Sequence, residues 1–197
     1  MIKFIGVYDY TVILTYISLA SAVFGMMQTT QGKFGGAIFC LLLSGICDAF
    51  DGLVARSKKN RTEMEKEFGI QIDSLCDVVG FGVFPAILSF YMGVNGMIGA
   101  VIVVAYCLCA VIRLAFFNVS ESNRQKKEGG CAKAYRGLPV TSIAVIFPFF
   151  YGLHFFLPES VFVIVLHVVM AATAFLFILD ISVPKPDWTK LFRIGKK

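Results

Sequence analysis

Residues 78–112 read VVGFGVFPAILSFYMGVNGMIGAVIVVAYCLCAVI, without one Asp, Glu, Lys or Arg. As a single helix this stretch would be about 52 Å long at 1.5 Å per residue. The hydrocarbon core of a bilayer is only about 30 Å thick. The turn-forming cluster Gly93-Val94-Asn95-Gly96 lies in the middle of the stretch. We therefore predict two membrane-spanning helices joined by a tight hairpin.

The composition extends this interpretation to the whole chain. Of its 197 residues, 57% are hydrophobic and 16% are charged, with a mean hydropathy of +0.77. A soluble domain carries about 25% charged residues. Three more uncharged stretches are long enough to cross a bilayer, at residues 11–30, 137–157 and 160–179. We predict one all-α membrane domain over residues 1–197, with six transmembrane helices near 7–28, 36–56, 69–92, 95–118, 138–158 and 160–183.

The basic residues predict the orientation of these helices. Sixteen of the 18 Lys and Arg residues fall before the first predicted span, at the end of the second or after it, after the fourth, or after the sixth. Only Lys33 falls in an opposite loop, and Arg113 lies within a span. By the positive-inside rule, both termini are cytoplasmic. We expect a multi-pass protein of the cell membrane whose functional site faces the cytoplasm, because the loops on the far side are very short.

The net charge of +5 has two interpretations. Basic loops set topology and contact anionic lipid headgroups in most membrane proteins. They could also attract an anionic nucleotide-linked lipid. A nucleic-acid partner is not expected, because the chain has no soluble domain to present the charge.

Four aspartates lie inside the predicted spans. Asp48 and Asp51 are near the end of the second span, and Asp73 and Asp77 near the start of the third. Each such residue costs about 2.5–3.5 kcal/mol to insert. Their i,i+3 and i,i+4 spacings place each pair on one helix face, and antiparallel spans bring both pairs to similar depth. Two divalent cations would offset the repulsion. The alternative is a set of helix-end aspartates in water.

Small and basic residues accompany these aspartates. Gly52 and Ala55 leave room for a bulky group beside the second span, and Gly69 opens the third span on the opposing side. Arg56 carries a planar guanidinium suited to phosphate. The pattern therefore favours a site for a phosphorylated ligand.

The motif formed by these residues is D-x-x-D-G-x-x-A-R, followed by G-x-x-x-D-x-x-x-D. It covers Asp48, Asp51, Gly52, Ala55, Arg56, Gly69, Asp73 and Asp77, and it resembles the signature of the CDP-alcohol phosphotransferases. The predicted six-helix topology is also similar. The spacer over residues 57–68 has 12 residues, where the family usually has fewer, and we expect it to form a longer cytoplasmic loop.

The resemblance implies a two-metal displacement reaction with Mg²⁺ or Mn²⁺. One ion would be held by Asp48, Asp51 and Asp73, and the other mainly by Asp48, Asp73 and Asp77. Asp77 would also be the general base. Cytidine would lie near Gly52 and Ala55. Relatives of this kind are homodimers, and the resemblance extends that expectation to this chain.

Further segments resemble the phosphatidylserine synthase branch of the family. They are Glu67-Phe68-Gly69, Phe81-Gly82-Val83, Arg113 to Asn118, Gly137-Leu138-Pro139 and Val183 to Pro186. The resemblance implies CDP-diacylglycerol as the donor and L-serine as the acceptor. Val78 stands where branches that use glycerol 3-phosphate or inositol phosphate usually carry Lys or Arg, but these acceptors stay open as alternatives. An ether-linked archaeal donor also stays open. An ion or proton transporter is a remote alternative, because its acids should spread along a pathway.

Three basic residues are candidates for binding the acceptor or a lipid phosphate. Arg113 lies in an otherwise apolar run, and Lys133 and Arg136 precede the fifth span. An intramembrane arginine is expected to pair with an anionic group. That group is a substrate phosphate or carboxylate in one interpretation. In the other, the pairing is structural, with an aspartate or with helix-end carbonyls.

Overall fold

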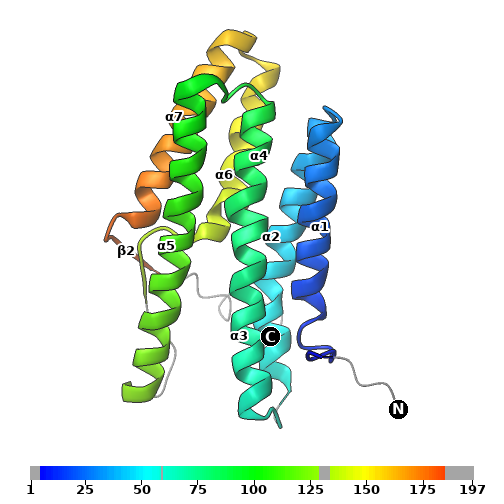
Figure 1. Ribbon diagram of the computed structural model, residues 1–197, viewed down its shortest axis with the longest axis vertical. Helices are drawn as coiled ribbons and strands as arrows, with labels where there is room; N and C mark the ends of the chain where they lie inside the picture. The colour runs from blue at the N-terminus through cyan, green and yellow to red at the C-terminus, as the bar shows by residue number, and fades with distance from the viewer. Residues whose placement is uncertain (1–4, 59, 129–133, 185–197) are drawn as a thin grey trace, which may run out of the picture.

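The computed structural model describes residues 5–58, 60–128 and 134–184. Its helices are α1 (Ile13–Thr30), α2 (Phe34–Ser57), α3 (Glu63–Asp77), α4 (Phe84–Tyr91), α5 (Gly96–Glu128), α6 (Ile143–Gly152) and α7 (Glu159–Ile178). A π-helical segment, η1 (Val78–Val83), joins α3 to α4, so residues 63–91 form one continuous rod (Figure 1). Two 3-10 turns, η2 (Val140–Ser142) and η3 (Leu153–Phe155), flank α6.

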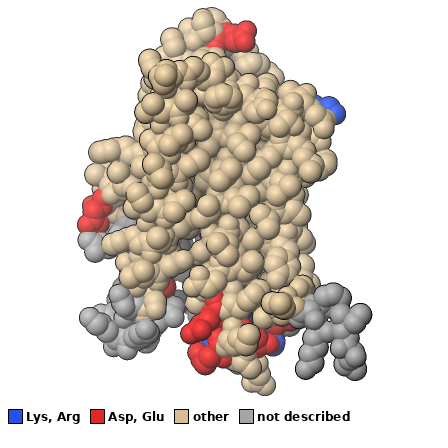
Figure 2. Space-filling model, viewed as in Figure 1, with Lys and Arg blue, Asp and Glu red and all other residues tan. Residues whose placement is uncertain are grey.

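Five helical segments of the described chain are long and apolar enough to cross a membrane: α1, α2, the rod over residues 63–91, α5 and α7. The sixth segment, Val140–Phe155, is apolar but shorter. Figure 2 shows an almost uncharged surface along most of the molecule, with acidic side chains gathered at its lower end. Large apolar side chains such as Met97 and Phe149 are exposed on that surface. These features confirm the prediction of a polytopic helical membrane protein.

The described chain contains a short two-stranded sheet that the sequence did not predict. Strand β1 (Ala134–Arg136) pairs antiparallel with β2 (Ser182–Pro184), with Tyr135 opposite Val183. The amide of Gly137 donates to the carbonyl of Ile181 at 2.6 Å. The chain before α6 is therefore attached to the chain after α7. Strands of three residues are too short for an alternating pattern to indicate them.

Small polar residues join α1 to α2. The hydroxyl oxygens of Ser18 and Ser44 lie 2.7 Å apart, and each lies 3.1 Å from the carbonyl oxygen of the other residue. The hydroxyl of Ser21 donates to the carbonyl of Cys40 at 2.9 Å. A side chain at Gly25 would overlap Phe84 and Cys40. Close helix packing through small residues is typical of membrane proteins, and it fixes α2 against α1.

The π-helical segment follows the aspartates of α3 directly. Pro85 has no N–H to donate to the carbonyl of Phe81, four residues earlier in the chain. The hydroxyl of Tyr106 on α5 donates to that carbonyl at 2.7 Å, and Tyr106 is fully buried. A side chain from α5 thus replaces the hydrogen bond that the proline removes, and it ties α5 to the rod just beyond Asp77.

The connection between α2 and α3 differs from the predicted long loop. The hydroxyl of Thr62 accepts a hydrogen bond from the backbone amide of Glu65. The Glu65 carboxylate accepts one from the backbone amide of Thr62, and the two bonds form a capping box. This cap starts α3 at Glu63, six residues before Gly69. Most of the additional spacer residues therefore extend α3 rather than the loop, which corrects the expectation from the sequence.

Candidate metal and nucleotide site

Three of the four aspartates form a compact cluster. Asp48 lies on α2, and Asp73 and Asp77 lie on α3. One carboxylate oxygen of each lies within 4.8 Å of those of the others. The antiparallel course of α2 and α3 (Figure 1) brings them together, as the matched depths in the sequence predicted.

Asp51 belongs to the same region but has a different environment. It is buried, with 8% of its surface exposed, and it lies within electrostatic range of Asp48 and Asp73. Its Oδ2 accepts a hydrogen bond from the hydroxyl of Thr15 on α1 at 2.9 Å. The hydroxyl fixes the orientation of this carboxylate, because Thr15 is itself buried.

The cluster fits a hard divalent cation. Its donors are all carboxylate oxygens, the ligands that Mg²⁺ and Mn²⁺ prefer. Asp73 Oδ1 is buried and has no hydrogen-bond partner within the described chain. A buried acceptor without a partner costs about 1–3 kcal/mol. A bound cation would remove that cost and would offset the repulsion among the carboxylates.

Thr15 and Asn118 were not predicted from the sequence. The amide nitrogen of Asn118, on α5, donates to the hydroxyl of Ser74 at 2.7 Å, one residue from Asp73. The signal for Thr15 was a series of small polar residues every third position along an apolar helix, Thr15, Ser18 and Ser21. Asn118 carried no such signal, because its partner lies 44 residues away.

Both α2 and α3 carry a glycine near the cluster, and an arginine guanidinium lies beside each glycine. On α2, Nη1 of Arg56 lies 3.7 Å from the point where a Cβ at Gly52 would be. On α3, Nη2 of Arg61 lies 2.6 Å from the corresponding point at Gly69. Ala55 is partly exposed on α2. The predicted small residues thus leave space that an arginine side chain approaches, Arg56 from α2 and Arg61 from the segment before α3.

Arg113 is buried against backbone carbonyls. Its Nε donates to the carbonyl of Leu138 at 3.2 Å and its Nη2 to that of Gly137 at 3.4 Å. Its guanidinium also lies 5.6 Å from the centre of the Phe117 ring. These contacts tie α5 to the turn before α6 and favour the structural interpretation. A substrate role for Arg113 stays a prediction. Lys133 and the side chain of Arg136 lie outside the described residues.

An ion pair network attaches the start of the chain to this end of the molecule. Nζ of Lys58 lies 2.7 Å from Asp9 Oδ2 and 2.9 Å from Glu65 Oε1. The hydrogen bond from Lys58, together with one from Thr11, lowers the pKa of Asp9 to about 2. Asp9 is therefore ionised at neutral pH, and the network holds the segment before α1 against the start of α3.

Comparison with known proteins shows the family to which this arrangement belongs. The family model described as CDP-alcohol phosphatidyltransferase matches residues 10–179. The chain belongs to this family. The match includes both halves of the CDP-alcohol phosphatidyltransferase motif, from Asp48 to Asp77, and all five described helical segments that are long enough to cross a membrane.

Several curated relatives are similar over much of the chain. An archaetidylserine synthase of Methanothermobacter thermautotrophicus is 32% identical over 89% of this chain and 69% of its own length. CDP-diacylglycerol–serine O-phosphatidyltransferases of Helicobacter pylori and Saccharomyces cerevisiae are 36% and 34% identical over 64% and 74% of this chain. The chain spans 52% and 54% of the length of those two proteins.

Proposed function

We propose that this protein transfers a phosphatidyl group from CDP-diacylglycerol to L-serine, giving phosphatidylserine and CMP. Three findings support the proposal: the family, the serine acceptor in the names of the three relatives, and the carboxylate cluster. The cluster is the observation that carries it, because three convergent carboxylates beside two arginines suit a pyrophosphate with its cations.

Two divalent cations, Mg²⁺ or Mn²⁺, are the proposed cofactors. Asp48, Asp73 and Asp77 would hold them together with Asp51. When bound, such ions neutralise a pyrophosphate and stabilise its departing half. Thr15 keeps the Asp51 carboxylate in one orientation for this purpose, by the 2.9 Å hydrogen bond described above.

The residues of the chain itself have distinct roles in the proposed reaction. The serine hydroxyl oxygen forms a bond to the lipid-bearing phosphorus, the bond from that phosphorus to the CMP oxygen breaks, and CMP leaves. Asp77 accepts the hydroxyl proton, and a positioned carboxylate contributes about 10²–10⁴-fold to such a step. Arg56 binds a phosphate oxygen through its planar guanidinium. Gly52 and Ala55 leave the space in which cytidine lies, and Gly69 leaves room on α3 at the phosphate side of the site.

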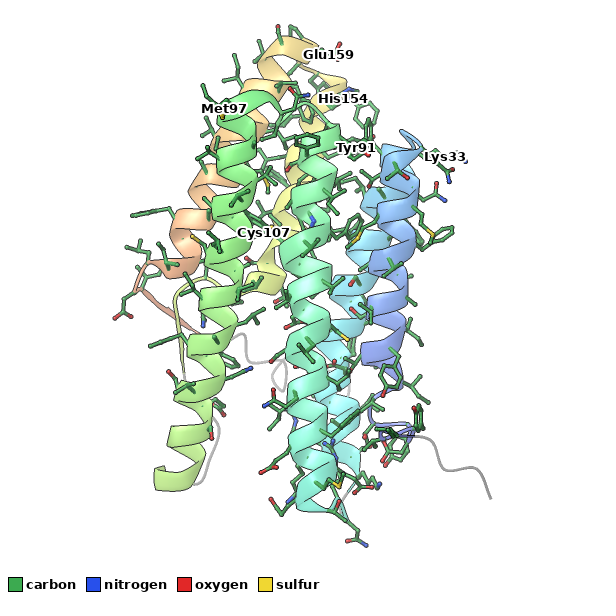
Figure 3. The ribbon with its side chains drawn as sticks, in the orientation of Figure 1. Lys33, Tyr91, Met97, Cys107, His154 and Glu159 are labelled. Atoms are coloured by element: carbon green, nitrogen blue, oxygen red, sulfur yellow. The ribbon has the colours of Figure 1, made fainter. Side chains whose placement is uncertain are left out.

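We propose that the site faces the cytoplasm and that residues 1–197 form one domain of the cell membrane, working as a homodimer. The distribution of basic residues supports the orientation. Lys33 lies at the upper end of the molecule in Figure 3. Helix α2 ends and α3 begins at the lower end (Figure 1). Lys58 follows the two aspartates of α2 in sequence, and Lys66 precedes the two of α3.

An acceptor screen tests the function. Purified protein receives CDP-diacylglycerol, Mg²⁺ or Mn²⁺ and one of serine, glycerol 3-phosphate or inositol phosphate, and CMP release is followed. We expect serine to be used at least about tenfold better in kcat/KM, which corresponds to about 1.4 kcal/mol. A preference for a phosphorylated acceptor would contradict the proposal. A parallel series with an ether-linked CDP-archaeol shows which donor the chain prefers.

Removal of metal is the second test. EDTA should abolish CMP release, and excess Mg²⁺ or Mn²⁺ should restore it, because the clustered carboxylates otherwise repel the pyrophosphate. Full turnover in chelator would show that the cluster does not hold a required cation.

A further inference from the structure

Arg61 lies outside the family motif, yet its side chain reaches the site. It precedes α3 and folds back along it, where Nη2 donates to the carbonyl of Glu65 at 2.9 Å. The same nitrogen lies 2.6 Å, and Cζ 3.7 Å, from the point where a Cβ at Gly69 would be. The guanidinium therefore occupies the space that the absent side chain of Gly69 leaves.

The guanidinium has an unused donor. Arg61 Nε is buried and has no hydrogen-bond partner in the part of the chain that the structure describes. The ion pairs among the described residues join Lys58 to Asp9 and Glu65, and Lys66 to Glu63, so Arg61 has no carboxylate partner there. Leaving a buried donor unpaired is costly, more so for a charged group. Its position is explained if an anion completes the hydrogen bonds.

The position of Arg61 relative to the cluster indicates which anion. Gly69, Asp73 and Asp77 follow one another at intervals of four residues, so they lie along one side of α3 about 6 Å apart along its axis. The Arg61 guanidinium is therefore about one helical turn from Asp73. Arg56 has the equivalent place on α2, over Gly52. An anion that spans the cluster would contact a guanidinium at each side.

We propose that Arg61 binds a phosphate oxygen of the donor's pyrophosphate through its Nε–H and a terminal N–H. Planar guanidinium groups bind phosphate through two parallel hydrogen bonds. The inference rests on the proposed function, in that the donor is a CDP-linked lipid. The inference gives a substrate-binding role to a residue of the spacer over residues 57–68. The family motif has no fixed residue in this spacer.

The test compares three variants of the full chain with the wild type. Arg61→Ala removes the guanidinium, Arg61→Lys keeps the charge but not the planar pair of donors, and Lys66→Ala removes a nearby exposed cation that pairs with Glu63. Steady-state kinetics give KM for CDP-diacylglycerol at saturating serine and KM for serine at saturating donor. Calorimetric titration with CDP, and separately with cytidine, in Mg²⁺ measures binding without turnover.

We expect Arg61→Ala to raise the donor KM and the Kd for CDP by about tenfold or more, equal to about 1.4 kcal/mol. The kcat, the serine KM and any cytidine affinity should stay within about twofold. Arg61→Lys should fall between wild type and Arg61→Ala, and Lys66→Ala should match the wild type. If Arg61→Ala does not fold, Arg61→Gln replaces it in the same measurements.

Four results would overturn the inference. Unchanged CDP affinity would show that Arg61 does not contact the pyrophosphate. A rise confined to the serine KM would assign Arg61 to the acceptor carboxylate, and tighter CDP binding would mean that Arg61 obstructs the site. An equal loss of CDP affinity in Lys66→Ala would show that Arg61 acts only through its positive charge and not through a specific contact. If the wild type does not use serine, the proposed acceptor is wrong, and the CDP titration still decides the role of Arg61.

Discussion

The four aspartates of the site are held in different ways, and their substitutions should differ accordingly. Asp51 is buried and accepts a hydrogen bond from Thr15. Asp48, Asp73 and Asp77 converge more openly, with one buried oxygen of Asp73 unpaired. Substituting Thr15 therefore disturbs the orientation of one proposed metal ligand, whereas substituting an aspartate removes a proposed ligand.

Thr15→Val tests the orienting hydrogen bond. Valine keeps the shape of threonine but cannot donate, so the Asp51 carboxylate becomes free to rotate. Loss of such a supporting hydrogen bond to a metal ligand typically costs about 10–100-fold in metal affinity or activity, and we expect the Mg²⁺ concentration for half-maximal turnover to rise by that order. Ser21→Ala is the control, because its hydroxyl bonds the carbonyl of Cys40 elsewhere on the same helix pair. Equal Mg²⁺ dependence in both variants would contradict an orienting role.

Asp77→Asn separates chemistry from binding. If Asp77 is the base, kcat should fall about 10²–10⁴-fold, while affinity for the CDP-lipid falls much less because Asp48, Asp51 and Asp73 remain. Asp48→Asn is the comparison and should lose metal binding and turnover together. Calorimetric titration with CDP-lipid in Mg²⁺, beside the turnover number, measures both quantities. Equally large losses of affinity and kcat in Asp77→Asn would assign Asp77 to metal binding alone.

The sequence predicted the residues of the motif but not the residues that support them. Regular spacing along helices was enough to place Asp48, Asp73 and Asp77 together. The spacing of Thr15, Ser18 and Ser21 marks one face of α1 but does not give the partner of Thr15, because that side chain crosses to a neighbouring helix. Arg61 carried no spacing signal, because its side chain folds back from a turn. Such contacts depend on how the helices pack, which a single sequence does not contain.

At the scale of elements, uncharged runs predicted most helices, while their ends depended on local hydrogen bonds. The start of α3 at Glu63 follows from the capping box between Thr62 and Glu65, a pattern that is visible in the sequence. The π-helical segment Val78–Val83 was not predictable, because its freed backbone groups are satisfied from α5. Single-turn π segments often lie at functional sites, and this one begins directly after Asp77.

Tyr106→Phe tests the bond that supports this segment. The change removes one hydroxyl and leaves the carbonyl of Phe81 buried without its 2.7 Å partner, at a cost of about 1–3 kcal/mol. For a chain of this size, each kcal/mol lowers Tm by about 2–4 °C. Thermal unfolding of the detergent-solubilised protein measures the shift. Tyr91→Phe is the matched control, because Tyr91 is half exposed. Equal shifts in the two variants would show that the Tyr106 hydroxyl adds nothing specific.

At the scale of the whole molecule, the distribution of charge bears on the proposed orientation of the site. Lys33 lies at the end of the molecule that also carries Glu159 (Figure 3), while Lys58 and Lys66 flank the start of α3 at the other end. The proposed orientation in the bilayer thus puts these two lysines on the cytoplasmic side, at the end of the molecule where α3 begins. The proposed orientation can be measured directly.

Cysteine labelling in intact cells tests this orientation. The described native cysteines are buried or half-buried, and a chain with Cys131→Ser serves as the unlabelled background. Lys33→Cys and Lys66→Cys are then introduced separately at exposed positions. By the positive-inside rule, a membrane-impermeant maleimide should label Lys33→Cys in intact cells and Lys66→Cys only after permeabilisation. The reverse pattern would place the aspartate cluster on the outer face and would contradict the proposed topology.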